Sequence, residues 1–180
     1  MSSQDLSVKP ERQGWASLLD LTPYHWFVFS MASLAWLFDC LDQQLFLIAR
    51  NSSMKALLPE GYDLKLYGGY ATSIFVAGWA MGGLIFGSVG DRIGRAKTLT
   101  MTVLLYSICT GLSAFSKGWV DFAVYRFVTG LGVGGVFGLA VALVADSLPS
   151  TSRTAALGLL QALSAVGNIT AGLISIGMAQ

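Results

Sequence analysis

Five long apolar stretches, separated by short polar segments, constrain this 180-residue chain more than any other feature. A helix needs about 20 mostly apolar residues to cross the hydrocarbon of a bilayer, and each stretch is close to that length. We predict membrane-spanning helices over residues 26–49, 67–89, 98–115, 119–145 and 154–178. Hydrophobic residues make up 54% of the chain and charged residues 12%, which excludes a disordered chain and does not suit a soluble surface. The sequence therefore predicts an all-α integral membrane protein.

Composition also narrows the possible partners. The net charge is +1 and no basic run occurs, so we expect no nucleic acid partner. Cys40 and Cys109 both lie in apolar stretches and are typical of small buried hydrophobic residues. With His25 as the single histidine, zinc has no plausible set of ligands. We predict no metal and no cofactor.

The basic residues of the loops predict an orientation. The N-terminal tail (1–25), the segment 90–97 and the segment 146–153 lie on one side and hold six Lys and Arg, against four on the other side. Because Lys and Arg concentrate on the cytoplasmic side, we place the N-terminus in the cytoplasm and the chain in the plasma (cell inner) membrane. The last apolar stretch has no polar tail after it, so we expect the front portion of a longer protein.

Glycines recur at four-residue spacing inside the apolar stretches: Gly78, Gly82, Gly130, Gly134 and Gly138. In a membrane this spacing lets helix backbones approach closely. The run from Gly130 to Gly135 also fits the GxGxxG pattern of dinucleotide sites, which needs a strand before it and a helix that opens at it. The middle of an apolar stretch offers neither. We therefore predict helix packing rather than nucleotide binding.

Three ionisable side chains lie inside predicted helices, namely Asp39 and Asp42 in the first and Arg126 in the fourth. A charge at mid-bilayer costs at least about 2.5–3.5 kcal/mol, so such a residue faces a partner or a water-filled cavity. Asp39 and Asp42 are three residues apart and share one helix face, together with Trp36, Gln43 and Phe46. This mixed face predicts a path for protons or substrate.

The depths of these charges predict an ion pair. Asp42 lies seven residues before position 49, and Arg126 lies seven residues after position 119, so each is about 10 Å from the same membrane edge. We predict that Arg126 pairs with Asp42, or with Asp39 one turn deeper. The pair either takes part in proton or substrate movement, which is usual for ionisable residues within a membrane, or is a static pair that only serves packing.

At this point the sequence resembles the major facilitator superfamily. Residues 87–97, GSVGDRIGRAK, resemble that superfamily's cytoplasmic signature Gly-x-x-x-Asp-Arg-x-Gly-Arg-Arg/Lys, with Ala96 in place of the second basic residue and Lys97 one position later. Residues 126–135 are similar to the arginine-glycine motif of the fourth helix. Residues 146–153 resemble the acidic-Pro-Arg motif that follows it. The three motifs stand in the right order at the right spacing and cover nearly the whole chain.

The resemblance implies a conformational latch on the cytoplasmic side. Its residues are Gly87, Gly90, Asp91, Arg92, Gly94, Arg95, Lys97, Asp146 and Arg153. A short turn needs glycines, and an arginine in it can reach a carboxylate such as Asp146. The alternative is that the basic residues only set the membrane orientation and contact lipid phosphates.

The first helix carries a clue to the substrate. Residues 38–42, Phe-Asp-Cys-Leu-Asp, are similar to the Asp-Gly-Phe/Tyr-Asp motif of the branch that carries organic acids with protons, including aromatic-acid and sialate symporters. Cys40 and Leu41 replace the usual glycine and aromatic residue. An organic acid would suit Arg126, and we expect one. A neutral sugar, which would suit Trp36, Gln43 and Gln44, is the alternative.

The resemblance further implies twelve membrane helices in two similar halves, each with two inverted three-helix repeats, of which this chain supplies five. We expect a proton-coupled carrier whose halves rock around a site at the membrane midplane, and not an enzyme. Asp39 or Asp42 would carry the proton. Two other classes stay open: a truncated membrane protein that binds partner helices through its glycine faces, and a half-carrier that dimerises.

Overall fold

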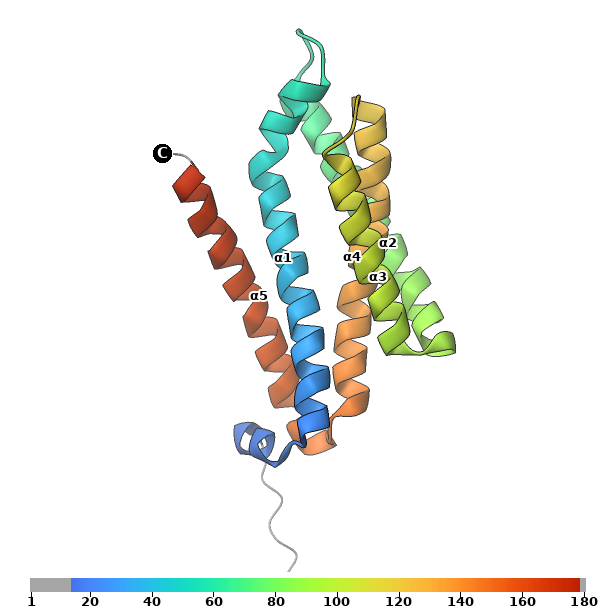
Figure 1. Cartoon of the computed structure of the whole chain (residues 1–180), viewed down its shortest axis with the longest axis vertical. Coiled ribbons are helices and arrows are strands. Elements are labelled where there is room, and N and C mark those ends of the chain that lie inside the picture. Colours follow the sequence, from blue (N-terminus) through green and yellow to red (C-terminus); the bar gives the residue numbers. More distant parts are fainter. Residues whose placement is uncertain (1–13, 179–180) are drawn as a thin grey trace, which may run out of the picture.

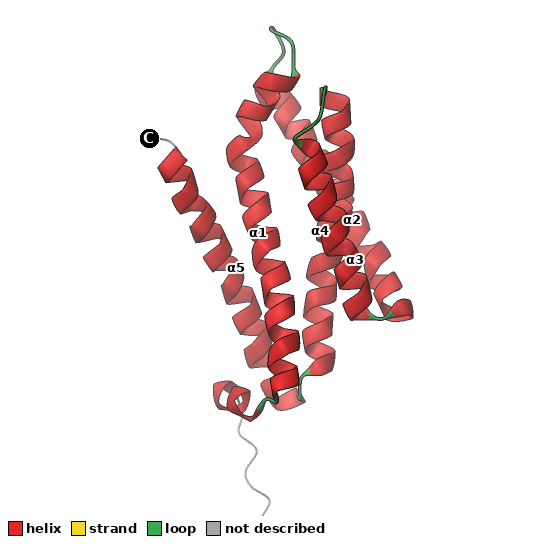
Figure 2. Ribbon diagram, viewed as in Figure 1, coloured by secondary structure: helices red, strands yellow, loops and turns green. Residues whose placement is uncertain are grey.

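The structure is a computed structural model that describes residues 14–178, so the predicted tail (1–25) is described only from Gly14 onwards. One 3-10 helix and five α-helices follow one another: η1 Gly14–Asp20, α1 Pro23–Leu57, α2 Leu64–Ile93, α3 Arg95–Ser113, α4 Trp119–Ser147 and α5 Ser150–Met178. The described residues contain no strand (Figure 2). The predicted all-α fold is confirmed.

Helix α1 is longer at both ends than the stretch 26–49 that the sequence predicts. It starts at Pro23, and the Thr22 hydroxyl caps it by accepting a hydrogen bond from the backbone N–H of His25. It runs through Arg50 to Leu57 because polar residues do not by themselves end a helix. Leu58 adopts an extended conformation, as expected for a residue that precedes a proline, here Pro59.

The helices form two groups, one of α2, α3 and α4 and the other of α1 and α5, and contacts between α1 and α4 join them. Helix α4 packs most extensively against α2 and then α3, while α5 packs on α1, and α1 also contacts α4. The turns α2–α3 and α4–α5 lie at the same end of the molecule as η1, and the connections α1–α2 and α3–α4 lie at the other end (Figure 1). This up-and-down order agrees with the predicted alternation of the loops.

The α2–α3 junction is a single residue. The sequence predicts a loop over 90–97, whereas α2 continues to Ile93 and α3 begins at Arg95. The residue between them, Gly94, has a φ of 103°. Side chains disfavour this backbone conformation, and glycine adopts it freely. One glycine therefore turns the chain without a loop.

Three of the five described α-helices are long and apolar enough to cross a membrane. They are α2, α4 and the Ser150–Ile174 part of α5. Helices α1 and α3 have 35 and 19 residues, but they carry more polar side chains, such as Asp39 and Asp42 on α1. The count of five membrane-spanning helices stays a prediction.

Glycines bring α2 and α4 into backbone contact, as the four-residue spacing predicts. A methyl group added at Gly78 or Gly82 would overlap carbonyl oxygens of α4, and one added at Gly130 or Gly134 would overlap carbonyl oxygens of α2. A side chain at any of these four positions would push the helices apart. The prediction of helix packing is confirmed for them.

Gly138 does not take part in this contact between α2 and α4, and its predicted packing role stays a prediction. No atom lies within 4 Å of a Cβ added there, and the residue is exposed. The α2–α4 contact has already loosened at Gly83, where an added Cβ would lie 3.5 Å from the Gly134 oxygen. Gly132 instead faces α3, with an added Cβ 2.8 Å from Tyr106 Cβ, and Gly135 lies between α3 and α2, with an added Cβ 2.6 Å from Thr102 Cγ2 and 2.8 Å from Phe86 Cβ.

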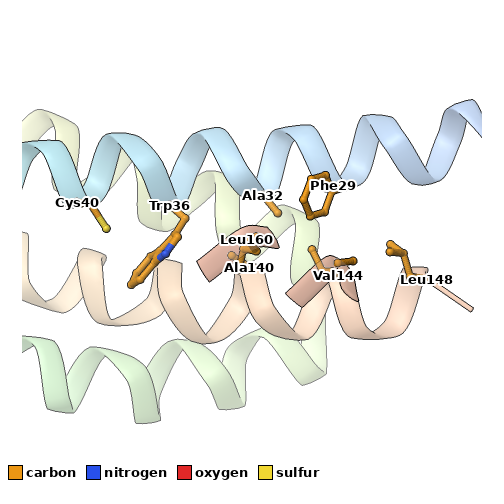
Figure 3. Close-up of a cluster of buried hydrophobic side chains, with 9 residues drawn as sticks. Phe29, Ala32, Trp36, Cys40, Ala140, Val144, Leu148 and Leu160 are labelled. Carbon is orange, nitrogen blue, oxygen red and sulfur yellow. The ribbon is translucent and has the colours of Figure 1, made fainter. Parts of the chain in front are cut away.

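An apolar core joins α1, α4 and α5 at the end of the molecule that holds η1. Its buried members are Phe29, Ala32, Trp36, Cys40, Ala140, Val144, Leu148, Ala156 and Leu160. The side chains of α1 in this set point toward α4 (Figure 3). The Trp36 indole, predicted to line a path, lies at the edge of this core and 4.6 Å from the ring centroid of Phe137.

Candidate functional site

The polar face of α1 begins with a completely buried carboxylate. Asp39 is 0% exposed. Its Oδ2 accepts a hydrogen bond of 3.2 Å from Gln43 Nε2, one helical turn further along α1. Its Oδ1 has no hydrogen-bond partner in the structure. Asp39 and Gln43, which the sequence places on one helix face, therefore interact directly, and the other carboxylate oxygen has no partner among the described residues.

Asp42 is held by α3, which the sequence analysis missed. Its Oδ2 accepts a hydrogen bond of 3.4 Å from Thr110 Oγ1, and Tyr106, one turn before Thr110, lines the same cavity as Asp42. Thr102, Tyr106 and Thr110 are each four residues apart and therefore share one face of α3. This row of hydroxyl groups in an apolar stretch could have indicated a polar face of α3. The sequence analysis missed it because it looked for charged residues.

Arg126 is buried between aromatic rings rather than paired with an aspartate. It is 6% exposed, and its Cζ atom lies 3.9 Å from the ring centroid of Phe46 on α1 and 5.5 Å from that of Phe122 on α4. A flat guanidinium stacks well on such rings. No ion pair within 4.0 Å joins Arg126 to Asp39 or Asp42 in the described chain, so the predicted pair is not in contact in this conformation and stays a prediction.

Several buried polar atoms of α1 and α4 have no hydrogen-bond partner among residues 14–178. They are Ser33 Oγ, Trp36 Nε1, Asp39 Oδ1, Arg126 Nε and Thr129 Oγ1. Buried polar groups are normally paired, so these two helices hold unused hydrogen-bonding capacity of both donor and acceptor type. Within residues 14–178 no three His, Cys, Asp or Glu side chains gather as a metal site requires.

A groove of about 900 Å³ runs between α1 and α3 and reaches Asp42 and Thr110. Most of its lining is apolar, with Phe27 and Phe38 of α1 and Val103 of α3 among the residues that form it. Asp42 therefore lines this groove, whereas Asp39 does not. The two carboxylates occupy different environments although they lie on the same helix face.

Arg95 connects three helices at the α2–α3 turn. Its Nη1 lies 2.9 Å from Asp146 Oδ2, and its Nη2 lies 3.4 Å from Asp91 Oδ1. Arg95 begins α3 and Asp146 lies in the last turn of α4, so each charge is unfavourable to the dipole of its own helix. The ion pair offsets both. The expected contact between an arginine of this segment and Asp146 is confirmed.

The remaining residues of the predicted latch do not all join this contact. Arg92, Lys97 and Arg153 are exposed, and none forms an ion pair within the described part of the chain. Gly90 is buried against the Leu139 side chain of α4, whereas Gly87 has open space on its free side. The structure thus brings together Asp91, Arg95 and Asp146.

Comparison with known proteins matches residues 16–180 to the family described as "Sugar (and other) transporter". The benzoate transport protein of Acinetobacter baylyi is 31% identical over 159 residues, which are 86% of this chain and 33% of that protein. The putative niacin/nicotinamide transporter NiaP of Bacillus subtilis is 38% identical over 147 residues, which are 81% of this chain and 35% of that protein. The chain spans about a third of the length of these relatives.

A solved structure shows the same fold. The crystal structure of a bacterial homolog to the human lysosomal transporter Spinster, inward-facing and unoccupied, superposes with a TM-score of 0.73 at 19% identity, over 86% of this chain and 32% of that chain. The matched relatives are transporters and not enzymes, as the sequence analysis predicts. The chain is therefore an integral membrane protein that belongs to the major facilitator superfamily, where it corresponds to the N-terminal half of a transporter.

Proposed function

We propose that this chain is part of a secondary active transporter that carries a small organic acid. The observation behind this proposal is Arg126, the one buried cation among residues 14–178, which no carboxylate contacts within 4.0 Å. A substrate carboxylate would neutralise this charge through short, charge-assisted hydrogen bonds. A neutral sugar would leave the charge uncompensated in a buried site, which is costly.

The names of the relatives support the same substrate class. One is a benzoate transport protein and another a putative niacin/nicotinamide transporter, and both benzoate and niacin are aromatic carboxylic acids. Arg126 lies beside two phenylalanine rings, Phe46 and Phe122, which suit an aromatic substrate ring as well as the guanidinium. We therefore choose benzoate and nicotinate as the first test substrates.

Protons are the proposed coupling ion, and Asp39 and Asp42 are the proposed carriers. Asp39 is sealed from solvent with one free oxygen, and Asp42 is reached from the groove between α1 and α3. A carboxylate in such a site carries its charge at a cost unless a proton or a cation neutralises it. Alternating access would expose the aspartates to each side of the membrane in turn.

Uptake of labelled benzoate into proteoliposomes under an imposed pH gradient tests this coupling. The full gene product that contains this sequence is reconstituted with Asp39→Asn or Asp42→Asn. We expect at least one variant to lose gradient-driven accumulation about tenfold or more while it still exchanges benzoate at equal pH. Asp121→Asn, at an exposed position in the first turn of α4, is the matched control. Accumulation at the wild-type level in both variants would overturn proton coupling through these residues.

The Arg95–Asp146 ion pair is the proposed latch of one transport conformation. Because both side chains are partly exposed, the pair adds about 1 kcal/mol or less to folding stability. We expect Arg95→Gln to lower benzoate uptake several-fold with little change in thermal stability, and the exchange Arg95→Asp with Asp146→Arg to restore part of it. Arg92→Gln, at an exposed neighbour without an ion pair, serves as control. Equal uptake in all of these variants would argue against a latch.

We further propose that the N-terminus and the latch face the cytoplasm across the plasma membrane. Arg92, Arg95 and Lys97 stand within six residues at this end, and dense Lys and Arg favour the cytoplasmic side. Helices beyond those described would complete the carrier, since relatives are about three times as long as the matched region.

A further inference from the structure

Two different partners for one cation lie on the same face of α1. Phe46 stacks on the Arg126 guanidinium at 3.9 Å. Asp42 precedes Phe46 by four residues, which places it on the same helix face about 6 Å away along the helix axis. No ion pair within 4.0 Å joins Asp42 to Arg126 among the described residues, but their opposite charges attract each other at longer range. A shift of the guanidinium by one helical turn would exchange the ring for the carboxylate.

The ring of Phe46 is held in place by its neighbours. Phe46 is 8% exposed and belongs to a buried cluster with Met54, Ala71 and Phe122. The centroids of the two phenylalanine rings are 6.1 Å apart. Because this packing fixes the ring, little side-chain entropy of Phe46 is lost when the guanidinium packs on it. The ring is thus a preorganised contact for Arg126.

The partner that Arg126 contacts, Phe46 or Asp42, decides whether its charge is available to bind an anion. A guanidinium paired with Asp42 would already be neutralised and would bind an anion weakly. A guanidinium stacked on Phe46 keeps its net charge and its N–H donors, and its Nε has no hydrogen-bond partner in the structure. An aromatic ring therefore stabilises the cation without consuming its hydrogen-bonding capacity.

We propose that Phe46 is a positioning residue for substrate binding, which holds Arg126 away from Asp42 and keeps its charge free for the substrate carboxylate. This inference rests on the function proposed above and adds to it a competition between a ring and a carboxylate for one cation. It predicts that the loss of the ring is harmful because Asp42 then captures Arg126, so removal of the Asp42 charge compensates for the loss.

Benzoate exchange at equal pH across proteoliposomes of the full gene product tests this competition. We expect Phe46→Leu to raise the KM for benzoate about tenfold with Vmax within twofold of wild type. Phe46→Tyr keeps a ring and is expected to keep the wild-type KM. The double variant Phe46→Leu/Asp42→Asn is expected to return the KM to within about threefold of that of Asp42→Asn alone. Phe115→Leu, which removes an exposed ring near the α3–α4 turn, is the matched control and is expected to leave the KM unchanged.

A control for folding shows whether a change in KM comes from the position of Arg126 or from a misfolded variant. Elution of every variant as a single peak in size-exclusion chromatography checks folding, and Phe46→Met replaces Phe46→Leu if the leucine variant aggregates. An unchanged KM in the ringless variant, or no restoration by Asp42→Asn, overturns the inference. Arg126→Gln tells the two proposals apart: full exchange activity in that variant defeats the organic-acid proposal, whereas lost activity together with an inert Phe46→Leu defeats only the role of Phe46.

Discussion

Replacement of Arg126 by glutamine is expected to lower the kcat/KM for benzoate exchange at least a hundredfold. Loss of one partner from a buried, hydrogen-bonded charge pair costs about 2–5 kcal/mol, and a hundredfold change corresponds to about 2.7 kcal/mol. Glutamine keeps a hydrogen-bond donor but no charge. The measurement is initial exchange of labelled benzoate at several concentrations, with the amount of folded transporter matched between samples.

Two further variants make this result specific. Arg126→Lys keeps the charge but loses the planar fork and the ring stacking, so we expect an intermediate loss. Lys117→Gln removes a cation from an exposed turn and is expected to leave exchange within twofold of wild type. If Arg126→Gln exchanged benzoate normally while Lys117→Gln did not, the substrate anion would have to bind elsewhere.

Replacement of Gly134 by valine is expected to have the largest effect on folding. An added Cβ at this position would overlap the Trp79 carbonyl oxygen, and backbone atoms cannot rotate away as a side chain can. Overpacking of a well-packed interior typically costs about 1–3 kcal/mol and sometimes more, and we expect the upper end of that range. Thermal unfolding in detergent, followed by the loss of the monodisperse chromatographic peak, measures the effect.

The same helix supplies the matched control. Gly138→Val adds the same atoms four residues later, where no atom lies within 4 Å of the added Cβ, so its unfolding temperature is expected to stay close to that of wild type. Valine has a higher helix propensity than glycine, and this difference is the same at both positions, so it does not separate the two variants. Equal unfolding temperatures for the two variants would show that α2 and α4 do not depend on close backbone contact.

The sequence was sufficient for the helices and for the residues with unusual chemistry. Long apolar stretches locate α1 to α5, and the cost of a charge inside a membrane singles out Asp39, Asp42 and Arg126. Spacing along one helix also places Asp39 and Gln43 on one face, where they form a hydrogen bond. These are properties of a single helix, which the residue order determines directly.

Contacts between helices were harder to predict because they depend on how each helix is rotated and tilted. The residue count along each helix predicts that Arg126 lies level with Asp42. The rotation of α1 and α4 decides which side chain it contacts, and in the structure that side chain is Phe46. Helix crossing explains why Gly134 packs tightly and Gly138 does not. The contact of Thr110 with Asp42 could not be predicted, because a neutral hydroxyl in an apolar stretch does not show which helix lies beside it.

The single-residue junction at Gly94 ties the geometry of the site to the length of a distant turn. Because α3 starts directly after Gly94, one inserted residue would rotate the following helix by about 100° and advance it by about 1.5 Å. Thr110 would then leave Asp42, and Tyr106 would leave Gly132. The length of this junction therefore fixes the rotation of α3 about its own axis. An insertion or deletion there, far from the aspartates, would change which side chains of α3 lie beside Asp42.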